Sequence, residues 1–151
     1  MKKILNPFFL AMLVFAVLSA CSDSDDMKPK DKLPDAEAPT NFEVQKGGTL
    51  TAQSSTNTRG MFQIVKDDTG AYFVRLTSDF TTKFSTGTVT VYLSDSDRLD
   101  LSQSGSFQLV SVVGKAGEHF FPLAAAPDSK FTHGIIWCGA AAIPFGFTLL
   151  Q

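Results

Sequence analysis

The chain has 151 residues, of which 13 are basic and 15 acidic, and its net charge at pH 7 is −2. The basic residues form no patch, which argues against nucleic acid as a partner. No CxxCH motif is present, so the sequence excludes covalently attached haem.

The N-terminus has the layout of a secretory signal peptide over residues 1–20. Lys2 and Lys3 precede an apolar run over residues 8–18, which is too short to span a bilayer as a stable helix. The ending Leu-Ser-Ala before Cys21 resembles a bacterial lipobox. The resemblance implies that Cys21 is lipidated and acylated and anchors the chain in a membrane. An ordinary cleaved signal with a chance cysteine is the alternative.

Residues 21–40 are predicted to be a disordered linker, because they are polar, rich in proline and without an aromatic residue. An acidic cluster follows Cys21 and is similar to the tag that sends some bacterial lipoproteins to the outer face of the outer membrane. It consists of Asp23, Asp25 and Asp26. We therefore expect a lipid-anchored protein of the bacterial outer membrane, periplasmic or surface-exposed.

The remainder, residues 41–151, is long enough for one small domain with its own core. Loss of the signal removes two of the 13 basic residues and none of the 15 acidic ones, which leaves a net charge of −4. If Cys21 carries lipid, Cys138 has no intramolecular partner. An unpaired cysteine in an exported protein is either buried, paired with another molecule or reactive.

The domain is predicted to be all-β, because short runs rich in Phe, Val, Thr and Tyr alternate with turn residues. Residues 60–66 and 71–80 are expected to form a hairpin around an Asp-Asp-Thr-Gly turn. Residues 134–138 are apolar throughout and are expected to be a central strand, while Pro144 and Gly146 indicate a bulge or an edge. The other expected strands are 48–55, 88–97, 106–114, 118–123 (running back after a turn at 114–117) and 142–150. About eight or nine strands suit an antiparallel β-sandwich or a compact barrel.

The tripeptide Asp68-Thr69-Gly70 occurs in aspartic proteases, which need two facing carboxylates. A turn between two strands explains the same residues, because Asp and Gly favour turn conformations. We therefore predict a turn at this position.

A weak calcium candidate is formed by Asp95, Asp97 and Asp100, whose spacing is similar to an EF-hand loop. The sixth position is Asp100 where the motif needs Gly, and the twelfth is Ser106 where it needs Glu. A solvated loop between strands is the favoured interpretation.

The two histidines, His119 and His133, are too few for a structural zinc or copper site. No ligand follows Cys138 at blue-copper spacing. A cysteine hydrolase would need a base beside Cys138, but His133 lies five residues earlier and on the opposite face of a strand. The sequence implies no metal and no cofactor of its own, and we expect a protein that is not an enzyme.

From about residue 47 to residue 150 the chain resembles the electron-transfer DM-thirteen domain family. The resemblance is strongest over residues 134–150, where Trp137-Cys138 is followed by a short spacer and an apolar-Phe-Gly run. Residues 75–82, 89–94 and 109–123 fit other segments of the family pattern. Residues 85–88 depart from it, because Ser-Thr-Gly-Thr replaces the usual Gly-Pro-Asp.

The resemblance implies an all-β extracytoplasmic domain in which Cys138, beside Trp137, takes part in redox transfer. An electron partner, including any haem, would then be a separate protein. The competing hypothesis is a structural, adhesive or ligand-binding surface lipoprotein in which Cys138 is a core residue, since free cysteine packs well in cores. We expect Cys138 to end its strand, mostly buried but near the surface, with Ile136 on the same face and Trp137 on the other.

Overall fold

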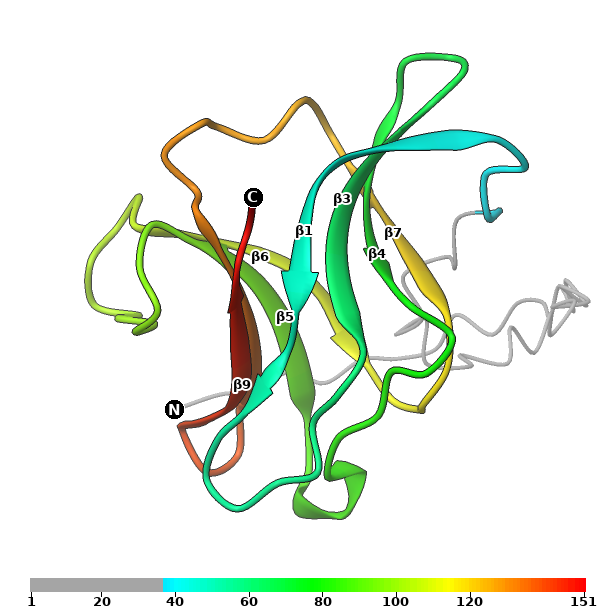
Figure 1. Cartoon of the computed structure of the whole chain (residues 1–151). Coiled ribbons are helices and arrows are strands. Elements are labelled where there is room, and N and C mark those ends of the chain that lie inside the picture. The colour runs from blue at the N-terminus through cyan, green and yellow to red at the C-terminus, as the bar shows by residue number, and fades with distance from the viewer. Residues whose placement is uncertain (1–36) are drawn as a thin grey trace, which may run out of the picture. The chain divides into compact units, whose positions relative to one another are not determined.

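The computed structural model describes residues 37–151 (Figure 1). The signal peptide, Cys21 and most of the linker lie outside these residues, so the expectations for them stay predictions. The described part contains nine strands and one short 3₁₀ helix. They are β1 (Phe42–Thr49), β2 (Thr51–Ala52), β3 (Met61–Asp67), β4 (Tyr72–Leu76), η1 (Phe84–Thr86), β5 (Val89–Ser94), β6 (Phe107–Val113), β7 (His119–Leu123), β8 (His133–Cys138) and β9 (Ile143–Leu149).

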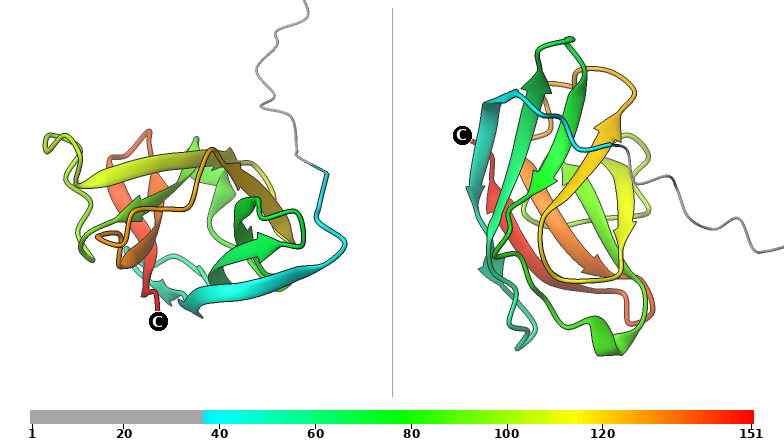
Figure 2. Two further views of the ribbon diagram at one scale, coloured as in Figure 1. Left: turned by 90° about the horizontal axis from the view of Figure 1, so that it is seen from above. Right: turned by 90° about the vertical axis from the view of Figure 1, so that its right-hand side faces the viewer.

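The strands form two antiparallel sheets, as the sequence predicted, and the sheets face each other as a sandwich and not as a closed barrel (Figure 2). The four-stranded sheet has the order β1-β3-β4-β7, and the five-stranded sheet has the order β2-β9-β8-β5-β6. The expected hairpin of β3 and β4 is present, with Val65 opposite Phe73. The expected central position of residues 134–138 is also confirmed, because β8 is the middle strand of its sheet.

The core lies between the sheets and follows the two-residue alternation of each strand. In β5, Val89, Val91 and Leu93 point inward and are buried. Phe62 of β3 reaches across to β8, where a side chain on Gly134 would come within 2.6 Å of its ring. The absence of a side chain at Gly134 therefore lets the Phe62 ring pack directly against the opposite sheet.

The strand expected over residues 48–55 is divided between the two sheets. A single strand was expected over residues 48–55, but the chain leaves the four-stranded sheet at Thr49, buries Leu50 and enters the other sheet as the short β2. β1 also begins earlier, at Phe42, because it pairs along the whole of β3. Local patterning did not indicate this strand, since charged residues interrupt it.

β7 turns back after β6, but it does not pair with it. It crosses to the four-stranded sheet and pairs with β4, with Phe121 opposite Val74. The bulge expected near the C-terminus is present in β9, where Gly146 pairs with Ile136 and Pro144 with Trp137, so that Phe145 is the extra residue. Phe145 turns into the core.

Candidate functional site

Cys138 is the last residue of β8, as expected, and its side chain is buried inside the core cluster with 0% exposure. It is the free cysteine of the part of the chain that the structure describes. Its sulfur lies 3.8 Å from Thr86 Oγ1 and 3.9 Å from the carbonyl oxygen of Thr86. Both neighbours are neutral: the carbonyl oxygen can only accept, and the Thr86 hydroxyl already donates to the Lys83 carbonyl at 3.1 Å, so neither supplies the cationic partner of a reactive thiol.

The cover over the sulfur is thin. It consists of η1 and the residues that follow, where positions 85–88 are all exposed. The cover is fastened at its far end, because the Gly139 N–H donates to the Thr88 carbonyl at 2.8 Å. Gly87 has a φ of 113° and sits against Ala140, so a side chain there would meet both strain and contact. The exposed segment 85–88 thus lies next to the buried sulfur of Cys138.

Trp137 lies on the other face of the sheet from Cys138, as strand alternation requires. It is half-buried and pairs with Thr90, whose hydroxyl donates to the Trp137 carbonyl at 3.2 Å. The two side chains predicted as a redox pair are therefore adjacent in sequence but point to opposite sides of β8.

Neither histidine lies beside the sulfur in the hydrogen-bond network. His119 Nε2 contacts the Lys115 carbonyl at 3.0 Å, and its ring stacks on Phe121. His133 contacts the Thr132 hydroxyl at 2.9 Å from the opposite end of β8. Cys138 thus has no general base within reach in this arrangement.

The Asp68-Thr69-Gly70 tripeptide forms the turn between β3 and β4, as predicted. The residue that organises the turn is its neighbour Asp67. One oxygen of Asp67 accepts from the Thr69 N–H, the Thr69 hydroxyl and the Ala71 N–H, at 2.7–3.0 Å. These bonds, the Thr69 hydroxyl foremost, hold the pKa of Asp67 below its ordinary value.

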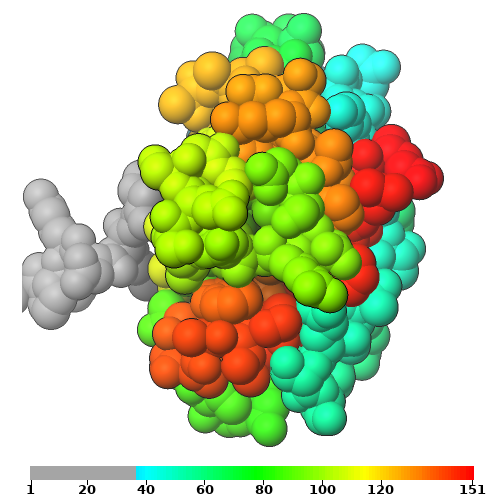
Figure 3. All heavy atoms as spheres, turned by 90° about the vertical axis from the view of Figure 1, so that its left-hand side faces the viewer, coloured from blue at the N-terminus to red at the C-terminus, as the bar shows by residue number. Residues whose placement is uncertain are grey.

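The calcium candidates lie in the loop of residues 95–106, between β5 and β6, as the favoured interpretation predicted. Asp100 accepts from the Ser102 N–H at 2.9 Å and from its hydroxyl at 2.6 Å, which lowers the Asp100 pKa. Within residues 37–151 no three His, Cys, Asp or Glu residues are grouped so as to hold a metal ion. The loop extends away from the sheets in Figure 1, and its atoms lie at the front of the face shown in Figure 3 (green to yellow-green).

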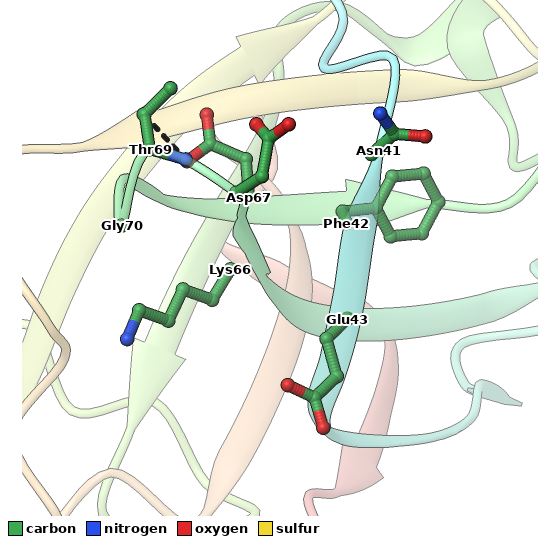
Figure 4. A pocket seen from close by; sticks show the side chains of 8 residues that line it. Asn41, Phe42, Glu43, Lys66, Asp67, Thr69 and Gly70 are labelled. Carbon is green, nitrogen blue, oxygen red and sulfur yellow. Dashed lines mark hydrogen bonds between the residues drawn. The ribbon is translucent and has the colours of Figure 1, made fainter.

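Two surface depressions are lined by neither Cys138 nor a histidine. The larger, of about 450 Å³, lies between the start of β1 and the β3–β4 turn. The side chains of Asn41, Asp67 and Thr69 lie together in the upper part of Figure 4, whereas that of Lys66 extends away from them toward the lower left. A smaller one, of about 210 Å³, is lined by Lys46, Ile64, Tyr72 and Phe131 among others.

The feature that sequence reasoning missed is the outer face of the five-stranded sheet. The register places at least ten side chains on this face, and none of them belongs to Asp, Glu, Lys or Arg. They are Thr90, Tyr92, Leu109, Val112, His133, Ile135, Trp137, Pro144, Phe147 and Leu149. The signal was visible in residues 134–138, where both alternating sets are apolar, but it was interpreted as burial in the interior. We call these ten residues the apolar face.

No family model, no curated protein and no solved structure matches the chain. The resemblance to the electron-transfer DM-thirteen domain family therefore stays a prediction. In the described residues no helix has the length and apolar character needed to cross a membrane.

Proposed function

We propose that the chain is a lipid-anchored envelope module that works by binding or adhesion, and that Cys138 is a core residue. The core role of Cys138 is supported by the environment of its side chain, which is fully buried in the apolar core cluster and has the two Thr86 oxygens as its polar neighbours. The proposed lipid anchor is supported by the signal-like N-terminus and by Cys21 after it. The expected location is the bacterial outer membrane, periplasmic or surface-exposed, with the membrane itself as the first partner.

The chemistry around Cys138 favours packing over redox transfer. A reactive cysteine is exposed at least in part and has a cation or a helix N-terminus nearby that stabilises the thiolate. Cys138 instead lies at the end of the middle strand of its sheet, where it pairs with Val89 and Ile143. A small apolar side chain fills such a position well.

Electron transfer through Cys138, to a separate partner protein, is the second candidate. One observation favours it: the polar neighbour of the sulfur is Thr86, which lies in the exposed segment 85–88. If this segment opens without unfolding of the sheets, the thiol reaches solvent. The competing functions therefore differ in one measurable property, the rate at which Cys138 becomes accessible.

Thiol labelling of the full chain under native conditions tests the proposal. A core thiol reacts only as fast as the protein unfolds globally, so the labelling rate should follow the unfolding rate as urea is raised. Cys138→Ala provides the background, including any label on Cys21. Labelling much faster than unfolding in the absence of urea would contradict the core role and support electron transfer.

Anchoring is tested separately by the intact mass of the membrane-extracted protein. We expect a species that begins at Cys21 and carries added acyl mass. A soluble species that begins at another residue would show that no lipid is attached.

A further inference from the structure

The described part of the chain has four edge strands, and they differ in their protection against pairing with another chain. An unpaired edge offers a row of free N–H and C=O groups, and proteins guard such edges with charges, proline or short strands. β7 carries Pro122 as the fourth of its five residues, and β2 has only two residues. β1 carries Glu43 and Lys46. Its Gly47 also exchanges two backbone hydrogen bonds with Gln151 at the end of the chain, which occupy part of this edge.

β6 has almost none of these devices. It is seven residues long, its sequence FQLVSVV contains no charge and no proline, and it pairs only with β5. It also carries the two most exposed large apolar side chains among the described residues, Leu109 at 54% and Val112 at 50% exposure. Isolated apolar side chains on a surface are ordinary, but two on one open edge strand mark an interaction site.

The one irregularity of β6 does not close the edge. A bulge lies between Leu109 and Ser111, which pair with Tyr92 and Val91, and the extra residue Val110 packs against the core. The bulge accentuates the local twist, yet it leaves Val112 and Leu109 both on the apolar face. The edge is therefore continuous with that face.

We propose that a second copy of this chain pairs antiparallel along β6, about a two-fold axis, and joins the two five-stranded sheets into one. A two-fold interface must be complementary to itself. β6 meets this condition, because a strand without charges places no like charges opposite each other when it pairs with its own copy. Leu109 and Val112 of both copies then cover one another on the shared outer face. This inference does not depend on lipid attachment or on the role of Cys138.

The test is the oligomeric state of the full chain, purified in detergent and measured by sedimentation equilibrium at two ratios of detergent to protein. We expect a dimer that persists when detergent is added. Leu109→Lys with Val112→Lys should weaken the dimer at least about tenfold, because lysines on an edge strand oppose pairing. Both side chains are exposed, so the fold should survive, and far-UV circular dichroism checks that it does.

The matched control is Leu149→Lys, on the apolar face but away from β6, where Leu149 is 45% exposed. It should leave the dimer unchanged. A wild-type monomer at every concentration overturns the proposal, and so does a dimer that disappears on addition of detergent. A dimer weakened by Leu149→Lys and not by the β6 substitutions also overturns it, since the copies would then meet through the sheet face.

Discussion

The outer face of the four-stranded sheet is covered by a cluster of one arginine and aromatic rings, whereas the apolar face of the five-stranded sheet leaves the apolar side chains of Leu109, Val112 and Leu149 exposed. On the first, Arg75 lies 4.9 Å from the ring centre of Phe42 and 5.7 Å from that of Phe120. The two rings meet edge to face at 5.4 Å. Beneath this cover Val65 is fully buried, although it points away from the main core.

Hydrogen bonds to its charged group keep Arg75 in place between Phe42 and Phe120. Arg75 Nε donates to Glu118 at 2.8 Å, and its Nη1 donates to Gln63 at 2.8 Å, so the guanidinium is satisfied between the rings. The apolar face has no charged group that could do the same, and Trp137 and Leu149 there keep part of their surface in water. The two outer faces thus differ in how their apolar surface is treated. An arginine between two aromatic rings covers part of the first, while Leu109, Val112 and Leu149 stay exposed on the second.

The largest expected effect comes from a matched pair of valines on the two faces. Val65→Asp puts an unpaired carboxylate under the cover and should cost about 3 kcal/mol or more of unfolding free energy. Val112→Asp, at a half-exposed position, should change it by about 0.5 kcal/mol or less. Urea denaturation at a concentration where copies do not associate measures both. Equal losses would show that the two faces are not covered differently.

Phe42→Ala tests the cover itself. Removing one ring of the cluster takes away its contacts with Phe120 and Arg75 and should cost about 1–2 kcal/mol. Val44→Ala is the control on the same strand, because Val44 is exposed. If both changes have the same small effect in denaturant titrations, the start of β1 does not stabilise the sheet.

A smaller effect is expected for Arg75→Lys. Lysine keeps the charge but loses the planar group that stacks on the rings and the second nitrogen that bonds Glu118. The partners are partly exposed, so the loss should be about 1 kcal/mol or less. A double-mutant cycle with Glu118→Gln isolates the pair, and additive losses would mean that the ion pair contributes nothing.

The smallest effect is a dependence on pH that differs between the two sheets. The folded-state pKa of Asp67 lies below the ordinary value of 3.8, so its contribution is fully present above that value and is lost as the pH falls through the folded pKa. The pKa of Asp100 is also lowered in the folded state, but its carboxylate oxygen accepts two hydrogen bonds, whereas that of Asp67 accepts three. Asp67→Asn should therefore flatten the fall of the urea midpoint between neutral pH and pH ~3 more than Asp100→Asn. The reverse order would mean that the β3–β4 turn is not the better-bonded site.

Local patterns in the sequence were enough for a large part of the fold. Alternation and the Asp-Gly turn predicted the hairpin of β3 and β4, and the apolar run of residues 134–138 predicted a central strand. Pro144 and Gly146 predicted the bulge of β9. Each of these depends on neighbours within a few residues, where side-chain period and backbone preference act directly.

The sheet to which β7 belongs, the early start of β1 and the full burial of Cys138 were decided by tertiary structure. Phe42 begins a strand because β3 and the ring of Phe120 receive it, and Cys138 is sealed because residues 85–88, some fifty positions away, fold over it. A strand carries its side-chain alternation in its own sequence, but its neighbours and its cover come from distant segments. Their placement depends on closing long loops and packing two sheets together, which no local pattern encodes.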